Sequence, residues 1–313
     1  MERTHSRLPT VVVPFDPECG SERCNDVFLY LRPETNGIEV ESVMMRALSR
    51  SKKYHDKVRL AYLANLPGDF IDSRRIIEEH YRLKLKFTQE GKQLFTPYMK
   101  KEFSRYFEEP FEEATVLGAF EAMRYLHCSR DELFNLWVPQ RDVFHLNGQT
   151  IKKSDGIYII NYDIPAILQK NTSETDVAAM ALRTSLPFNE VAEMIAEIVE
   201  ALRTQGILNQ KQAFSRIFHY SKGPFEQILD AVGFLYDGKG RHISLEKLNF
   251  YQFLREKGLS NYEIRQILRY PIMSFRSRRR SYYEETIYTA TYGCSYENAY
   301  RTLCSACGQV LIE

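Results

Sequence analysis

The sequence contains no long apolar run and carries almost no net charge. No stretch approaches the roughly 18 apolar residues that a membrane-spanning helix requires. The apolar core before Pro14 is only three valines long, too short for a secretory signal. The net charge is +1, so only a local patch of charge could hold a nucleic acid. We therefore expect a cytoplasmic protein without a membrane partner.

Cysteines are sparse, because 313 residues contain only six of them, and this does not indicate a disulfide scaffold. Cys304 and Cys307 form a CxxC pair, and Cys294 lies upstream. A structural zinc needs about four nitrogen or sulfur ligands, whereas this segment offers three cysteines and no nearby histidine. Reduced, partly buried thiols without a metal are the favoured interpretation, and a zinc site is the alternative.

Common catalytic motifs are also missing from the sequence. There is no GxxxxGK[ST] phosphate loop, no GxGxxG after a strand, no GxSxG elbow and no HExxH pair. These absences exclude the enzyme classes that are most easily recognised from sequence, and they leave less common active sites open.

The composition is that of a folded protein with room for two domains. Hydrophobic residues make up 44% and charged residues 27%, values typical of soluble globular chains. Apolar periodicity divides the chain near residue 172. Before it, strands are predicted over 26–33, 58–66, 114–121 and 156–164, and helices over 38–51, 73–87 and 96–108. After it, helices are predicted over 173–185, 187–206, 210–220, 224–237, 243–258 and 259–270.

Three regions follow from this pattern: an N-terminal extension (1–23), an α/β domain (24–171) and a helical domain (172–313) whose C-terminal segment is basic and rich in tyrosine. The helix over 187–206 has one continuous apolar face. That face is either part of a core or a contact between copies of the chain in a homo-oligomer.

The first half resembles the nucleoside diphosphate kinase family. FLYLRPETNG (28–37) is similar to the opening strand of the family, and 76–103 to its glutamate-histidine-tyrosine helix, phenylalanine loop and next helix. EATVLGAFEAMRYL (113–126) is similar to the following strand and helix, and GQTIKKSDGI (148–157) to the loop over the phosphates. The resemblance covers about 24–168, with an insertion near 125–145. It implies an α+β fold in which a ferredoxin-like α/β sandwich precedes an all-α domain.

The catalytic histidine of that family is not kept. The family transfers phosphate through a histidine, which lies in a stretch similar to INYDIPAI (160–167). Asn161 keeps the asparagine of the motif, but Ile164 and Pro165 replace its histidine and glycine. Arg32 replaces the lysine that follows the opening strand. The resemblance therefore implies a catalytically inactive relative, and an active phosphotransferase with a nonstandard nucleophile is the alternative.

A ligand site is implied by the same resemblance. Its cationic positions correspond to arginine and lysine residues that could contact phosphates, its loop phenylalanine could stack on a base, and Mg²⁺ would accompany a bound nucleotide. No other cofactor or metal is predicted. The predicted ligand-binding residues are Arg32, Phe87, Phe95, Arg124, Thr150, Lys152 and Asn161. The alternative is that the phenylalanines belong to the core and the lysines to a solvated face.

The second half offers a separate binding region. The predicted helices over 243–258 and 259–270 meet at a Gly258-Leu-Ser260 turn with Ser260 as a cap, as in a helix-turn-helix, and FRSRRRSYY (275–283) follows. Arginines beside tyrosines suit single-stranded nucleic acid or another polyanion. The alternative is that these arginines pair with acidic residues of the same chain. The predicted nucleic-acid-binding or partner-binding residues are Arg265, Arg269, Arg276, Arg278, Arg279 and Arg280. We therefore expect a protein that binds a nucleotide or other phosphorylated ligand and regulates a protein or nucleic-acid partner.

Overall fold

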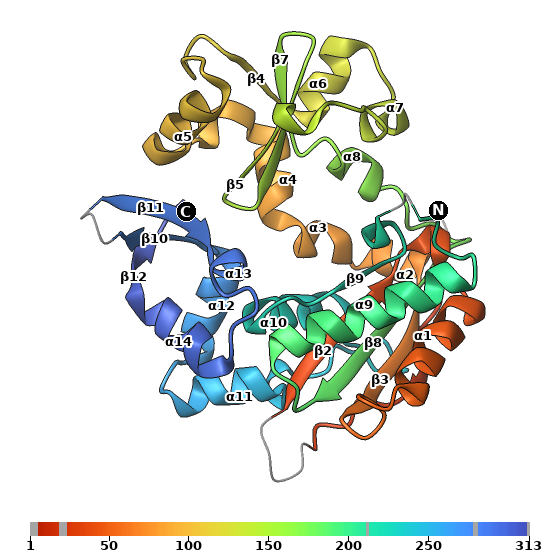
Figure 1. Ribbon diagram of the computed structural model, residues 1–313. Helices are drawn as coiled ribbons and strands as arrows, with labels where there is room; N and C mark the ends of the chain where they lie inside the picture. Colours follow the sequence, from red (N-terminus) through yellow and green to blue (C-terminus); the bar gives the residue numbers. More distant parts are fainter. Residues whose placement is uncertain (1–5, 19–23, 211–212, 278–280, 312–313) are drawn as a thin grey trace. The chain divides into compact units, whose positions relative to one another are not determined.

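The chain folds into two compact units. The computed structural model describes residues 6–18, 24–210, 213–277 and 281–311 (Figure 1). Unit 1 comprises 1–76, 170–261 and 291–301, and unit 2 comprises 77–169, 262–290 and 302–313. Both units combine helices with β-sheets, so the prediction of a mixed α/β protein is confirmed. None of the helices in these residues is long and apolar enough to cross a membrane.

Unit 1 is built on a five-stranded sheet. Its strands are β1 (Thr10–Val13), β2 (Asn25–Leu31), β3 (Val58–Pro67), β8 (Asp176–Thr184) and β9 (Phe218–Tyr220). Their order across the sheet is β1-β3-β8-β2-β9, and every neighbouring pair is antiparallel. β2 lies between two strands that come much later in the chain, so the sheet depends on long-range pairing.

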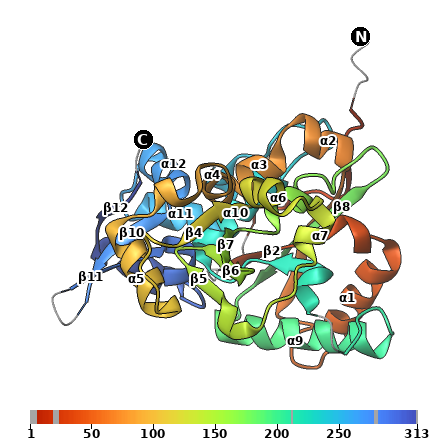
Figure 2. The same ribbon diagram turned by 90° about the horizontal axis from the view of Figure 1, so that it is seen from above.

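Helices cover both faces of this sheet. The helices of unit 1 are α1 (Ile38–Arg50), α2 (Gly68–Ser73), α9 (Phe188–Thr204), α10 (Pro224–Phe234) and α11 (Asn249–Glu256). On one face, α1 and α9 lie side by side over β2 and β8 (Figure 1, Figure 2). On the opposite face, Tyr30 stacks on Phe234 of α10 with ring centroids 4.2 Å apart, and the Tyr62 hydroxyl donates to the Tyr236 carbonyl. The aromatic side chains of β2 and β3 are therefore buried and leave no open stacking platform on these strands.

The central strand β8 corrects a helix prediction. Its sequence, DVAAMALRT, is rich in alanine, methionine and leucine, which favour helices in isolation. In the sheet, Ala181 pairs with Phe28 on one side and with Tyr62 on the other. Small side chains at this position leave room for the two large rings, so packing overrides helix propensity.

Unit 2 contains two smaller sheets. The first, in the order β4-β7-β6-β5, has a parallel β4–β7 pair and two antiparallel pairs, and the second has the order β11-β10-β12. Its strands are β4 (Thr115–Gly118), β5 (Val143–Leu146), β6 (Gln149–Ser154), β7 (Ile157–Ile160), β10 (Ile272–Arg276), β11 (Tyr282–Thr286) and β12 (Ala306–Gln309).

The helices of unit 2 pack around an aromatic core. Phe87, Phe95, Phe103 and Tyr158 are among its buried members. Thr96 is the N-cap of α5, because its hydroxyl accepts from the backbone amide of Met99. The helices are α4 (Arg82–Glu90), α5 (Pro97–Phe107), α6 (Ala119–Leu126), α7 (Arg130–Phe134), α8 (Ile164–Ile167) and α13 (Ile287–Ala290). Helices α3 (Ile76–His80), α12 (Asn261–Arg269) and α14 (Tyr296–Ser305) run across unit boundaries. Short 3-10 helices occur at η1 (Pro33–Thr35), η2 (Gly91–Leu94), η3 (Gln140–Asp142), η4 (Phe214–Arg216) and η5 (Leu245–Lys247).

The predicted division at residue 171 differs from the division in the structure. The region 172–313 was expected to be all-α, yet it contains β8, β9, β10, β11 and β12. The region 24–171 contributes to both units, because the chain passes from one to the other at residues 76 and 77. The expected all-α domain is therefore wrong, because strands from the second half complete one sheet and build another.

Candidate functional site

Two neighbouring helices of unit 1 frame the candidate site. In α1, Val40, Val43, Met44 and Leu48 recur at helical spacing, and all four are buried against the sheet. In α9, the predicted apolar face from Val191 to Leu202 is buried in the same core. This face is therefore part of the unit 1 core. The two helices present their remaining sides to solvent at their C-terminal ends.

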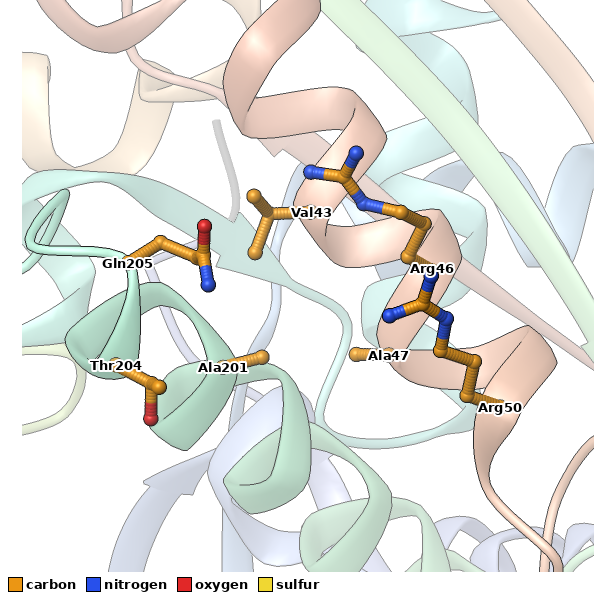
Figure 3. A pocket seen from close by; sticks show the side chains of 7 residues that line it. All are labelled: Val43, Arg46, Ala47, Arg50, Ala201, Thr204 and Gln205. Carbon is orange, nitrogen blue, oxygen red and sulfur yellow. The ribbon is translucent and has the colours of Figure 1, made fainter.

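A groove of about 420 Å³ opens between these two helix ends. Its lining residues are Val43, Arg46, Ala47, Arg50, Ala201, Thr204 and Gln205. Figure 3 shows both guanidinium groups on the α1 side and the Gln205 amide on the α9 side. Ala47 and Ala201 lie between them, and their small side chains keep the groove open.

Among the described residues, no neighbouring acid neutralises the positive charge of this groove. Arg46 and Arg50 are exposed, and neither forms an ion pair with the residues that the structure describes. On α9, Glu193 pairs with Lys53 at 2.5 Å and Glu200 lies 3.9 Å from Arg203. The contact with Glu193 also raises the pKa of Lys53 above its usual value. Two acids of the facing helix are thus engaged elsewhere, while both groove arginines stay available.

The lining chemistry suits binding of an anion. The groove offers two guanidinium groups, one amide, one hydroxyl and apolar walls, but no carboxylate, thiol or imidazole among its lining residues. It therefore lacks a side chain that could act as a general base or as a strong nucleophile. It also lacks the carboxylates that Mg²⁺ prefers, so it does not fit a protein-held magnesium ion.

The predicted ligand-binding arginines fall in different units. Arg32 belongs to unit 1, where its Nε donates to the Ser215 carbonyl and its guanidinium lies over the Tyr30 ring. Arg124 is exposed on α6 of unit 2. The structure therefore does not place these two residues in one compact unit, as the expected single α/β domain required.

The other predicted ligand residues make structural contacts inside unit 2. Lys152 is buried in β6, where its ammonium donates to the Leu136 carbonyl and lies 3.4 Å from the centroid of the Tyr162 ring. Phe87 and Phe95 are buried in the core and meet edge to face with centroids 6.0 Å apart. The alternative of core phenylalanines is thus the one observed, because neither ring has an open face for a base.

Asn161 and Thr150 are brought together by a hydrogen-bond network. The Asn161 side chain accepts from the amide of Thr150 and donates to the Gln149 side chain and the Lys84 carbonyl. The Thr150 hydroxyl lies 3.2 Å from Nδ1 of His145. Asn161 is fully buried and has a φ of +53°, so its side chain fixes an unusual backbone turn between β7 and α8.

The predicted nucleic-acid-binding arginines are partly described. Arg265 and Arg269 are exposed on α12, and Arg276 is exposed at the end of β10. The other three arginines of the prediction lie outside the described residues: Arg278, Arg279 and Arg280.

The cysteines form no metal centre in the described part of the chain. Cys128, Cys294, Cys304 and Cys307 are free thiols, and no group of three histidine, cysteine or acidic side chains there could hold a metal ion. Cys304 and Cys307 are exposed, so the expectation that these thiols are partly buried is wrong for the CxxC pair. Cys24, in another part of the chain, is disulfide-bonded.

No protein-family model, curated protein or solved structure matches the chain. The groove must therefore be interpreted from its own residues. Sequence reasoning missed Arg46 and Arg50, although one signal was present: two arginines four positions apart, flanking Ala47, on the polar side of an amphipathic helix.

A second cluster in unit 1 contains three ionisable side chains, those of His219, Glu226 and Asp230. Nε2 of His219 lies 3.2 Å from Oδ2 of Asp230 and 3.7 Å from Oε1 of Glu226. The Ser221 hydroxyl donates to Asp230, and the backbone amide of Lys222 donates to Glu226. Asp230 is fully buried, so this cluster is a packed polar network rather than an open site.

Replacing Glu226 with glutamine is expected to stabilise the protein increasingly as the pH rises. Burial raises the pKa of Glu226, the negative charge of Asp230 adds to the effect, and His219 opposes it. Because the pKa of Glu226 is higher in the folded than in the unfolded state, its carboxyl favours folding most at a pH below its unfolded pKa near 4.5. This contribution to the free energy of unfolding falls as the pH rises through the pKa of the folded state, and glutamine, which does not ionise, avoids the loss. Urea unfolding at pH 4.5, 6 and 8 measures this trend. Glu197→Gln, at an exposed site on α9, should show no such trend; a Glu226→Gln effect that does not change with pH would contradict the interpretation.

Proposed function

We propose that the protein binds a phosphorylated small molecule, of the size of a mononucleotide, in the groove between α1 and α9. The single observation that carries this proposal is the pair Arg46 and Arg50, two guanidinium groups without an acidic partner in the described chain, at a groove of about 420 Å³. Ligand pockets range from about 300 to 1,000 Å³, so this volume suits a small ligand.

The two arginines favour a phosphate ligand for an electrostatic reason. Residues four positions apart on a helix are neighbours, and like charges at this spacing are mutually destabilising. A bound phosphate would remove that repulsion and accept paired hydrogen bonds from each planar guanidinium. Arg50 in the last turn of α1 also interacts favourably with the helix dipole, which explains one of the two arginines without a ligand. Arg46 has no such explanation.

We also infer that unit 1 is a ferredoxin-like sandwich. The support is the chain order β2-α1-β3 followed by β8-α9-β9, with all neighbouring strands antiparallel and both helices on one face. The last two strands come from residues 176–220, outside the segment that resembles the kinase family. The binding proposal therefore rests on the groove and is independent of that resemblance.

Titration calorimetry with pyrophosphate and with nucleoside mono-, di- and triphosphates tests the proposal. Binding of at least one of these probes is expected at millimolar concentration or below. The double variant Arg46→Gln/Arg50→Gln should weaken that binding at least tenfold, since each charged hydrogen-bonded contact contributes about 1.5 to 3 kcal/mol. Arg301→Gln, which removes another exposed arginine of unit 1, is the matched control and should bind as the unmodified protein does.

A steric variant separates the groove from a general effect of charge. Ala201→Leu leaves the net charge unchanged and fills the space between the helices, so it should weaken binding while both arginines remain. If no phosphate probe binds, or if the double arginine variant binds as tightly as the unmodified protein, the proposed function is wrong.

A further inference from the structure

A β-hairpin of unit 2 presents arginine and tyrosine side chains to solvent. β10 and β11 pair so that Arg276 lies opposite Tyr282 and Phe275 lies opposite Tyr283. Phe275 and Tyr283 stack with centroids 5.3 Å apart, which anchors one face of the hairpin. Arg276 and Tyr282 share the other face, because side chains alternate along a strand and directly opposed residues lie on one side.

Two tyrosine rings of this hairpin are exposed to solvent. Tyr282 is 59% exposed and Tyr283 is 41% exposed. Arg276 beside them is exposed and has no ion pair within the described residues. The backbone amide of Ser277 donates to the Ser281 carbonyl, so strand pairing continues beyond this point. The regular pairing of β10 with β11 therefore holds the Arg276 side chain next to the exposed ring of Tyr282.

The nearest acidic side chain on the same face is already engaged. Glu284 accepts hydrogen bonds from the Thr96 hydroxyl and from the Asn147 side-chain amide. Thr96 is also the cap of α5, so the positive end of that helix lies close to the Glu284 carboxylate. The sequence left open that these arginines pair with acidic residues of the same chain. The contacts show instead that Glu284 binds Thr96 and Asn147 and does not pair with Arg276.

Further positive charge lies on the helix that leads into the hairpin. Arg265 and Arg269 are exposed one turn apart on α12, which ends just before β10. The Gln309 side chain donates to the carbonyls of Gln266 and Tyr270, which ties β12 to the end of this helix. Helix α12 and the hairpin are therefore joined by β12 within unit 2.

We propose that this hairpin binds single-stranded nucleic acid, with Arg276 on a backbone phosphate and Tyr282 stacked on a base. Arginine neutralises phosphates, and an exposed aromatic ring stacks on bases whatever their sequence. The open face of Tyr282 favours a single strand over a duplex, because bases inside a duplex are already covered by their neighbours. The positive charge of Arg276 is complementary to the negative charge of a nucleic-acid backbone. The acidic residue on the same face of the hairpin, Glu284, is already engaged by Thr96 and Asn147.

Fluorescence anisotropy with a labelled 20-nucleotide oligothymidine tests this proposal, with a duplex of equal length for comparison. Binding of the oligothymidine is expected at 50 mM salt and should weaken steeply at 200 mM salt. Tyr282→Ala should lower the affinity about tenfold, within the range known for loss of one stacked base, and Tyr282→Phe should retain it. Arg276→Gln should reduce the slope of log affinity against log salt by about 0.7, the value for one phosphate contact on a single strand.

Arg141→Gln is the matched control, because this exposed arginine of unit 2 already lies 3.9 Å from Asp142. It should leave both the affinity and the salt slope unchanged. Thermal unfolding of each variant establishes that these surface changes leave the fold intact. The proposal is overturned if oligothymidine does not bind at 50 mM salt, if Tyr282→Ala binds it as tightly as the unmodified protein, or if the duplex binds more tightly than the single strand.

Discussion

Replacing Asp26 with alanine should lower the free energy of unfolding by about 3 to 5 kcal/mol, the usual cost of removing one partner from a buried ion pair. Asp26 is 1% exposed and Arg183 is 3% exposed, and Nη2 of Arg183 lies 2.6 Å from the carboxylate. The second carboxylate oxygen accepts from the backbone and side-chain amides of Asn249. The alanine variant would therefore leave a buried guanidinium without its counter-charge and two amides without their acceptor.

Two comparisons make the Asp26 experiment specific. Urea unfolding should show that Asp26→Leu combined with Arg183→Met is more stable than Asp26→Ala alone, because the double variant leaves no unpaired buried charge. Arg59→Gln, which breaks the exposed pair with Asp16, should cost no more than about 1 kcal/mol. If Asp26→Ala costs no more than Arg59→Gln, the buried pair does not stabilise unit 1 in the way described.

Replacing Gly118 with alanine should destabilise unit 2 by about 3 kcal/mol, the upper part of the range for overpacking. A Cβ at this position would lie 2.1 Å from the carbonyl oxygen of Thr88 and 2.7 Å from its carbonyl carbon. Both atoms belong to the backbone of α4, so no side-chain rotation can relieve the clash. Gly118 connects β4 directly to α6, and a shift there would disturb both elements.

Gly37→Ala provides the matched control for the Gly118 substitution. No atom lies within 4 Å of a Cβ built at Gly37, whose φ of 166° is extended backbone that any residue adopts. Gly37 is the N-cap of α1, where alanine is less favourable than glycine, so thermal and urea unfolding should show a loss of no more than about 1 kcal/mol for Gly37→Ala. Equal effects of the two substitutions would show that the approach of Gly118 to Thr88 is looser than described.

The sequence predicted the elements whose pattern is local and strong. β2, α1, β3 and α9 were all predicted within two residues at each end, because their apolar spacing and their flanking proline or glycine residues are clear. β8 was missed because its alanines favour a helix until Tyr62 and Phe28 surround them. The hairpin β10–β11 was missed because arginine and serine residues obscure its alternation. The division into units was missed because it depends on pairings between distant segments, which a single sequence does not reveal.

The candidate groove was less predictable than the fold. Arg46 and Arg50 look like ordinary solvent-facing residues of α1, and only the approach of α9 turns them into one wall of a groove. In contrast, the family resemblance predicted Phe87 and Asn161 as ligand-binding residues. Both are buried inside unit 2, where Asn161 donates a hydrogen bond to the Gln149 side chain. Residue types alone could not distinguish exposed binding residues such as Arg46 from buried structural residues such as Phe87. The difference is how far each side chain is buried, and that depends on segments that are distant in the sequence.

The pairing of β2 with later strands affects how the chain folds during its synthesis. This apolar strand ends at Leu31, whereas its two partners end at Thr184 and Tyr220. At about 5 to 20 residues per second, a ribosome needs roughly 8 to 30 s to extend the chain from Leu31 to Thr184. During that interval the segment from Val27 to Leu31 has neither neighbour available, so it remains an unpaired apolar strand that can aggregate until β8 has been synthesised.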